Sequence, residues 1–445
     1  MEPSVPRRRE IVDALRRGTV PRRGIEWLAT GLGRFTEAID GEIDRAAVQG
    51  GAFKAVRGDY GCGKTFFARW VQYRALDKDF AVAEVQISET ETPLHRLETV
   101  YRRAVESLRT REWEEGAFRS LVDRWFYDLE EEVLGRDGFP QSDAAAVAKA
   151  VGELLEQRLV KVSAQQPMFA AVLRAIHAAR TANAPATADG LLAWLMGQPN
   201  VGAAVKRAAG IKGEVDTHTA AGFLRGLLAV LAQTGRRGLF LVLDEVETVQ
   251  RMRGDVREKS LNALRQLIDE VEGGRYPGLY LMITGTPAFF DGPQGVKRLQ
   301  PLEQRLHVDF APDTQFDSSR AVQIRLPGFD EPRLLEVGRK VRDLYPASHP
   351  ERVTAKVGDD VVTALARKVT GKLGGKVGVA PRIFLKKLVG EVLDRVDEHE
   401  AFDPLRHYQL EVSAAELNAE ERAAAGMERS PDDIALDLSG AAGES

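Results

Sequence analysis

The stretch that most constrains this chain is GDYGCGKT at positions 58–65, which matches the pattern G-x-x-x-x-G-K-[ST] without a gap. The preceding residues, AFKAVRG, form a strand-like run, and the following TFFARWVQYRAL has the apolar spacing of a helix. In such a strand–loop–helix turn, glycines let backbone N–H groups point inward at a phosphate, and the helix N-terminus adds a favourable dipole. The sequence therefore predicts a nucleotide phosphate loop. Its expected lining residues are Gly58, Asp59, Tyr60, Gly61, Cys62 and Gly63.

Lys64 and Thr65 complete this loop. We expect Lys64 to neutralise charge on the β- and γ-phosphates, and the Thr65 hydroxyl to bind magnesium. Cys62 is the only cysteine of the chain, so no intramolecular disulfide can form, which is typical of a reducing cytoplasm. We interpret Cys62 as a small residue that fits the turn, with a redox role as the weaker alternative.

A second strand-like run, Leu239 to Leu243, ends directly in Asp244 and Glu245. Magnesium needs a carboxylate, and a hydrolytic water needs a base. We therefore expect Asp244 to hold the metal through water and Glu245 to polarise the attacking water as general base. The alternative is a buried strand whose polar end merely meets solvent. Because a nucleotide switch can manage with the metal-binding Asp alone, the pair of acids favours hydrolysis of ATP, with Mg²⁺ as cofactor.

Three further residues are candidates for contacts near the γ-phosphate. Thr284 ends the strand-like run of GLYLMITGTPAFF, where its hydroxyl would reach the γ-phosphate or the attacking water. A threonine also suits a strand for its β-branch alone. Arg305 and Arg382 each carry a planar, permanently charged guanidinium that suits phosphate oxygens. Both arginines have the alternative of an ordinary surface position, and Arg298 is the alternative to Arg305.

The two halves of this site are separated by a long insertion. Many more residues lie between Thr65 and Asp244 than a strand and a crossover helix require. Most of the intervening pattern is helical, and the apolar residues of 118–133 recur at helical spacing. We expect that stripe to be core, with a partner or DNA surface as the alternative. After the strand-like AVQIRLPGF, three helical stretches predict a C-terminal lid.

The predicted fold class is therefore α/β, a P-loop NTPase with a parallel sheet, a large helical insertion and a C-terminal helical lid. The expected divisions are 1–92 for the N-terminal helix and the first half of the core, 93–235 for the helical insertion, 236–326 for the second half of the core, 327–423 for the lid and 424–445 for a disordered tail.

Composition narrows the class of protein. The 445 residues are 44% hydrophobic and 29% charged, with no apolar run long enough to span a bilayer and no secretory signal behind the N-terminal basic residues. We expect a soluble, cytoplasmic protein without a membrane partner. The seven histidines are scattered, so a metal site built mainly from protein ligands is not expected.

The formal charge of −4 argues against a surface coated in nucleic-acid-binding charge. A local basic patch lies near the N-terminus, with a solvated amphipathic helix as its alternative interpretation. If the chain binds DNA, we expect phosphate contacts from this patch and an affinity that falls steeply with salt. The patch consists of Arg7, Arg8, Arg9, Arg16, Arg17, Arg22 and Arg23.

The order of these features resembles the AAA+-type ATPases of the origin-recognition and Cdc6-like branch. TGLGRFTEAI at 30–39 is similar to the N-terminal box of that branch, which implies that Gly33 and Arg34 lie near the adenine. The resemblance further implies an AAA+-like core in a homo-oligomer. Its expected family roles are sensor 1 for Thr284, arginine finger for Arg305 and sensor 2 for Arg382.

Longer phrases resemble the ATP-binding proteins of BREX bacteriophage-defence loci, of the BrxC/BrxD type. These phrases are ALRRGTVPRRG, RGDYGCGKTFF, ETPLHRLETVYR and VLDEVETV, and the resemblance covers about residues 8–390. The chain is short for a BrxC form and is closer to BrxD. The resemblance implies a bacterial cytoplasmic ATPase that acts against phage DNA alongside helicase, methyltransferase or nuclease-like partners.

Three functions are compatible with these observations. The leading hypothesis is an oligomerising ATPase that remodels or loads a partner on DNA. The alternative is a nucleotide-dependent scaffold or sensor module with negligible turnover. A small-molecule phosphotransferase is weaker, because we expect the lid to carry a sensor-like arginine rather than an evident acceptor pocket.

Overall fold

The computed structural model describes residues 3–136, 143–372 and 380–409. The predicted tail at 424–445 and two stretches of the predicted lid, 373–379 and 410–423, lie outside the described residues. Two compact units make up the chain. One comprises Leu32–Gly58 and Lys64–Leu326, and the other comprises Met1–Gly31, Asp59–Gly63 and Pro327–Ser445.

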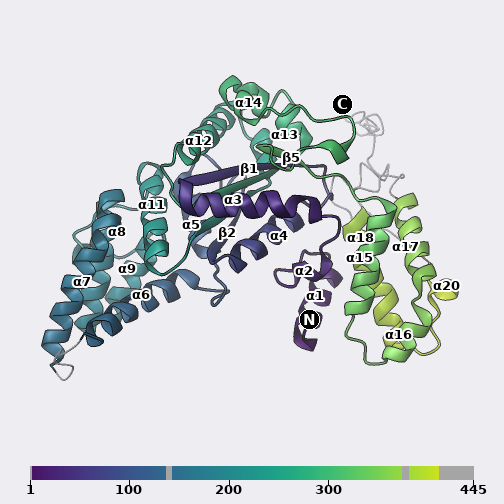
Figure 1. Cartoon of the computed structure of the whole chain (residues 1–445), viewed down its shortest axis with the longest axis horizontal. Coiled ribbons are helices and arrows are strands. Elements are labelled where there is room, and N and C mark those ends of the chain that lie inside the picture. Colours follow the sequence, from purple (N-terminus) through teal and green to yellow (C-terminus); the bar gives the residue numbers. More distant parts are fainter. Residues whose placement is uncertain (1–2, 137–142, 373–379, 410–445) are drawn as a thin grey trace, which may run out of the picture. The chain divides into compact units, whose positions relative to one another are not determined.

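A five-stranded, all-parallel sheet organises the first unit (Figure 1). The strand order is β2-β3-β4-β1-β5, so β4 lies between the strand before the phosphate loop and the strand that carries the two acids. This confirms the predicted α/β class with a parallel sheet. The strands are β1 (Gly51–Arg57), β2 (Phe80–Gln86), β3 (Gly238–Asp244), β4 (Leu279–Gly285) and β5 (Gln323–Arg325).

The central strands β3 and β4 are buried at every residue, as expected for parallel strands covered on both faces. Leu239, Leu241 and Leu243 join the large core that includes the insertion, whereas Asp244 follows on the opposite face because side chains alternate along a strand. Leu243 pairs with Ile283, so Asp244 and Thr284 are the next residues of both strands and share that opposite face.

Helices cover both faces of the sheet. On one face lie α3 (Thr36–Gln49) and α4 (Lys64–Asp77), and on the other lie α5 (Leu97–Glu106), α11 (Thr217–Gln233) and α12 (Gly254–Glu272) (Figure 1). The first turn of α4 therefore starts on the face to which the side chains of Asp244 and Thr284 belong. This layering positions the candidate site.

A buried polar cluster fixes β1, the strand that leads into the phosphate loop. The Lys54 ammonium lies 2.7 Å from a Glu42 carboxylate oxygen and donates to the Ala321 carbonyl at 2.5 Å. The Tyr280 hydroxyl donates to the other Glu42 oxygen at 2.6 Å. Because a buried charge is tolerated only when it is paired and hydrogen-bonded, this cluster fixes α3, β1 and β4 relative to one another.

In its described residues, the segment between β2 and β3 is mainly helical and shares one hydrophobic core with the sheet. The apolar stripe of residues 118–133 is buried, which confirms that it is core. Besides α5 and α11, this segment contains α6 (Ala117–Leu134), α7 (Ala144–Gln165), α8 (Pro167–Thr181), α9 (Pro185–Leu195) and α10 (Ala203–Ala208).

Short elements complete the first unit. They are η1 (Gly33–Phe35), η2 (Val246–Arg251), α13 (Pro287–Asp291), η3 (Val296–Arg298), α14 (Gln300–Leu306) and η4 (Thr314–Phe316).

The second unit is helical in its described part. Its N-terminal helix is tied to the C-terminal helices by Arg16, which donates to both carboxylate oxygens of Asp394 at 2.7 and 2.9 Å. None of the described helices of either unit combines the length and apolar character needed to cross a membrane. The helices of this unit are α1 (Val5–Arg16), α2 (Ile25–Leu28), α15 (Glu331–Leu344), α16 (Pro350–Lys356), α17 (Asp359–Lys372), α18 (Ala380–Lys387), the π-helical η6 (Leu388–Leu393), α19 (Asp394–Glu398) and α20 (Pro404–His407).

Candidate nucleotide-binding site

The predicted phosphate loop joins the end of β1 to the first residue of α4. Gly61 and Gly63 have φ values of 76° and 95°, a backbone region that side chains with a Cβ rarely adopt. The Cys62 amide donates to the Asp59 carbonyl at 3.3 Å, which closes a tight turn. Cys62 is buried, as expected for a small residue that fits the turn. The two glycines therefore occupy backbone conformations that a tight phosphate loop requires, as predicted from the sequence.

Lys64 begins α4 and is almost fully buried, with 8% of its surface exposed. Its ammonium donates to the Gly58 carbonyl at 3.0 Å. The same ammonium lies 4.0 Å from an oxygen of Glu247. The side chain is therefore held back over the start of the loop.

Thr65, Asp244 and Thr284 meet at the carboxyl edge of the sheet. The Thr65 hydroxyl donates to one Asp244 oxygen at 2.8 Å, and the Thr284 hydroxyl donates to the other. Burial raises the pKa of Asp244, and the two hydroxyl hydrogen bonds offset only part of that effect. The structure thus brings together three residues that the sequence singled out from separate segments.

Glu245 lies at a bend between β3 and η2. Its φ of 58° places a non-glycine residue in the left-handed region, which costs energy and persists only where the surroundings enforce it. Its amide donates to Asp244 Oδ1 and to the Thr284 hydroxyl, both at 3.2 Å. These two bonds hold the bend, and the Glu245 side chain is directed away from Asp244 toward β2.

Gln86, the last residue of β2, was not singled out in the sequence. Its side-chain amide donates to a Glu245 oxygen at 2.8 Å. Gln86 and Asp244 are paired across β2 and β3, so the sheet register brings Gln86 next to the acid pair. The only sequence signal is a polar residue at the end of the strand-like run KDFAVAEVQIS.

Glu247 is a second residue that the sequence analysis missed. It lies in the first turn of η2 with 5% of its surface exposed. Neither of its carboxylate oxygens has a hydrogen-bond partner within the described part of the chain. Burial raises its pKa to about 7, although the positive charge of Lys64 opposes the shift. An available signal was an acid between two apolar positions, Val246 and Val249, in LDEVETV.

Arg34 and Arg305 are engaged elsewhere in the first unit. Arg34 donates to the Thr314 carbonyl at 2.7 Å and lies over the Phe35 ring at 4.5 Å. A Cβ atom at the neighbouring Gly33 would meet no other atom within 4 Å. Arg305 in α14 is ion-paired with Asp269 of α12.

Arg298 and Arg382 have different surroundings. Arg298 ends η3, is exposed, and has no acidic partner among the described residues. Arg382 lies in α18 of the second unit, where its side chain approaches Gly18. Of the four predicted arginines, Arg298 is the one whose surroundings leave its charge open to another molecule.

The basic patch near the N-terminus is partly neutralised within the chain. Arg7 pairs with Glu10 at 2.8 Å, and Arg16 is held by Asp394. The exposed side chains of Arg9, Arg17 and Arg22 have no acidic partner in the described ranges.

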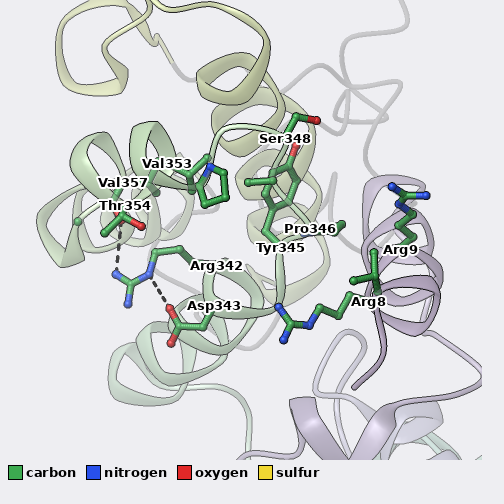
Figure 2. A pocket seen from close by; sticks show the side chains of 14 residues that line it. Arg8, Arg9, Arg342, Asp343, Tyr345, Pro346, Ser348, Val353, Thr354 and Val357 are labelled. Atoms are coloured by element: carbon green, nitrogen blue, oxygen red, sulfur yellow. Dashed lines mark hydrogen bonds and ion pairs between the residues drawn. The ribbon is translucent and has the colours of Figure 1, made fainter. Parts of the chain in front are cut away.

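Figure 2 shows a cavity of about 610 Å³ in the second unit, with Arg8 and Arg9 on one side and Arg342 on the other. Arg342 already donates to Asp343 at 2.9 Å and to Asp359 at 2.8 Å. The charge of Arg342 is thus compensated by these two carboxylates. The other basic side chains that line the cavity, Arg8 and Arg9, belong to α1.

The parallel sheet, the glycine turn and the lysine, threonine and aspartate at its carboxyl edge define a P-loop-like nucleotide-binding protein. The chain belongs to the family of BREX system ATP-binding proteins BrxC/D, whose family model matches residues 4–412. Membership supports ATP binding and a role in phage defence. Among curated proteins, none matches the chain significantly.

Proposed function

We propose that this protein hydrolyses ATP at the carboxyl edge of its sheet and uses the reaction in BREX defence to remodel or load a partner on DNA. The observation that carries the proposal is the meeting of Thr65, Asp244 and Thr284, with Glu245 directly beside them. A binding module needs a phosphate loop, whereas hydrolysis also needs a carboxylate for the metal and another for the water.

The residues at this edge fit Mg²⁺. The Thr65 hydroxyl and the Asp244 carboxylate are adjacent hard oxygen donors, and Mg²⁺ takes its remaining ligands from water and phosphate. Burial disfavours the charged form of Asp244, which a cation would favour. No group of three acidic, histidine or cysteine side chains that could hold a metal by itself occurs among the described residues. Magnesium bound here would neutralise charge on the phosphates.

Within this proposal, Glu245 takes the proton of the attacking water and Thr284 orients that water or the γ-phosphate. The Gln86 amide must release Glu245 before the carboxylate can act. That contact also supports the competing proposal of a scaffold or sensor with negligible turnover, since it occupies the base. A partner or nucleotide that separates Gln86 from Glu245 would convert one state into the other.

Replacement of Lys64 by Ala tests the assignment of the nucleotide site. We expect ATP affinity to fall by about 100-fold or more, because the site loses a buried countercharge for the β- and γ-phosphates while the glycine turn persists. Equilibrium dialysis with labelled ATP measures this, with the exposed Lys259→Ala in α12 as a matched control. If Lys64→Ala binds ATP with unchanged affinity, the assignment of residues 58–65 as the phosphate-binding loop is wrong.

DNA binding, if part of the function, should depend on Arg9, Arg17 and Arg22, whose charges are not compensated within the described chain. Their joint replacement by Ala should weaken duplex binding and reduce the slope of log affinity against log salt by about 2 to 3. Filter binding over a salt series measures both quantities. Arg111, Arg136 and Arg253 of the first unit are also exposed, and their joint replacement by Ala is the control. Salt-independent binding, or equal effects of both triple variants, would favour a protein partner instead.

A further inference from the structure

Glu247 is a buried carboxylate that accepts no hydrogen bond from another residue in the described part of the chain, and it lies beside the phosphate-binding lysine. Its side chain is 5% exposed, and the nearest cation is the Lys64 ammonium at 4.0 Å. Burying an unsatisfied carboxylate is costly, so its presence in a folded site requires an explanation. The hydrophobic core does not explain it, since the apolar residues that η2 contributes to that core are Val246 and Val249.

The bend at Glu245 separates the directions of the two glutamates. Glu245 contacts Gln86 on β2, whereas Glu247, in the first turn of η2, faces Lys64 on α4. Glu247 is therefore placed to act on the lysine rather than on the water that Glu245 is proposed to activate. We therefore expect Glu247 to affect how Lys64 binds phosphate.

Glu247 and a bound nucleotide would compete for the Lys64 ammonium. In the structure, this ammonium donates to the Gly58 carbonyl at 3.0 Å and lies 4.0 Å from a Glu247 oxygen. In the proposed function, the same ammonium binds the β- and γ-phosphates. When the ammonium moves to bind phosphate, Glu247 loses the cation beside it and lies near the negative charge of the phosphates. Such an arrangement of buried negative charges is unfavourable in a low dielectric.

We propose that Glu247 is a positioning residue that holds Lys64 in the nucleotide-free site and competes with ATP for it, so that ATP binds less tightly than the phosphate loop alone would allow. This inference rests on the proposed function, since it takes Lys64 as the phosphate-binding lysine. It adds a built-in limit on nucleotide affinity, located outside the phosphate loop and the acid pair.

The competition should depend on pH in a defined direction. Because the pKa of Glu247 is about 7, its carboxyl is mostly neutral below that value and charged above it. The charged groups that act on it electrostatically are Lys64 on α4, Asp244 at the end of β3 and Glu245, whose side chain is bonded to Gln86 on β2. Rising pH through neutrality therefore strengthens the hold on Lys64 and the repulsion of phosphate, and weakens ATP binding.

The test compares ATP affinity of the full chain with Glu247→Gln and Glu247→Met, measured by equilibrium dialysis with labelled ATP and Mg²⁺. Both variants remove the charge at similar side-chain volume, so either one suffices if the other fails to fold. At about pH 8 we expect roughly 10-fold tighter binding, equivalent to about one pKa unit of interaction, and at about pH 6 we expect nearly equal affinities. Titration of ATP itself is common to all proteins compared and cancels in the ratio.

Glu258→Gln on α12 is the matched control, because it removes one exposed negative charge from the same unit. Its affinity should equal that of the parent at both pH values. Equal or weaker binding by both Glu247 variants at about pH 8 would overturn the inference while leaving the nucleotide site intact. If Lys64→Ala binds ATP as well as the parent does, the proposed function fails first, and the two failures are distinguishable.

Discussion

Replacing Glu245 by Gln should leave ATP bound and slow its hydrolysis by about 100-fold or more, because the change removes the general base and keeps the shape of the side chain. The Thr65 and Thr284 hydroxyls that contact Asp244 do not depend on the Glu245 carboxylate. The proposed metal site should therefore survive. Steady-state phosphate release measures the rate, and dialysis with labelled ATP measures the retained affinity.

Asp244→Asn is the informative comparison for this variant. It changes the residue that accepts from both threonines, so we expect loss of metal-dependent binding together with loss of turnover. Turnover that persists in Glu245→Gln but vanishes in Asp244→Asn would show that Glu245 is not the base.

Replacing Arg305 by Ala should remove most hydrolysis, by about 10³-fold if the residue acts as an arginine finger, and leave ATP binding by each subunit nearly unchanged. A guanidinium delivered from a neighbouring subunit stabilises the charge that spreads over the transferring phosphoryl group. In the single chain Arg305 is paired with Asp269, so it must leave that carboxylate when subunits associate. Phosphate release as a function of protein concentration measures the effect.

Arg298→Ala is the control for the finger assignment. Arg298 is exposed and has no acidic partner in the part of the chain that the structure describes, so it needs no rearrangement to reach a neighbour. A large loss of ATP hydrolysis in Arg298→Ala, with little effect in Arg305→Ala, would show that Arg298 is the arginine finger.

Mixing Arg305→Ala with Lys64→Ala should restore part of the activity, since an intact finger then meets an intact nucleotide pocket at some interfaces. Hydrolysis that is independent of protein concentration, together with a fully active Arg305→Ala, would instead favour a monomeric switch.

The P-loop and the acid strand were predictable because their chemistry is local in sequence. Gly61, Gly63 and Lys64 follow from one loop pattern, and Asp244 follows from an apolar run that ends in acid. Their meeting was predictable too, because carboxyl ends of parallel strands share one edge and alternation places Asp244 and Thr284 on one face.

Other features depend on register and on bends, which no short pattern encodes. Gln86 reaches Glu245 only because β2 pairs with β3 at Asp244. Glu247 faces Lys64 only because Glu245 adopts a left-handed conformation that redirects the chain into η2. The roles of the arginines are more difficult to predict from the sequence, since they depend on contacts between subunits or with nucleotide. The position of an arginine in the sequence does not distinguish such a role from an internal ion pair like that of Arg305 with Asp269.

The most direct test of ATP hydrolysis is a single-turnover measurement, with the parent chain in excess over labelled ATP and Mg²⁺. The bound nucleotide is separated and identified over time, alone and with duplex DNA. We expect the parent to convert bound ATP to ADP and phosphate, and Glu245→Gln to retain ATP over the same period. Bound ATP that stays intact on the parent under both conditions would contradict hydrolysis and identify the protein as a nucleotide-dependent scaffold.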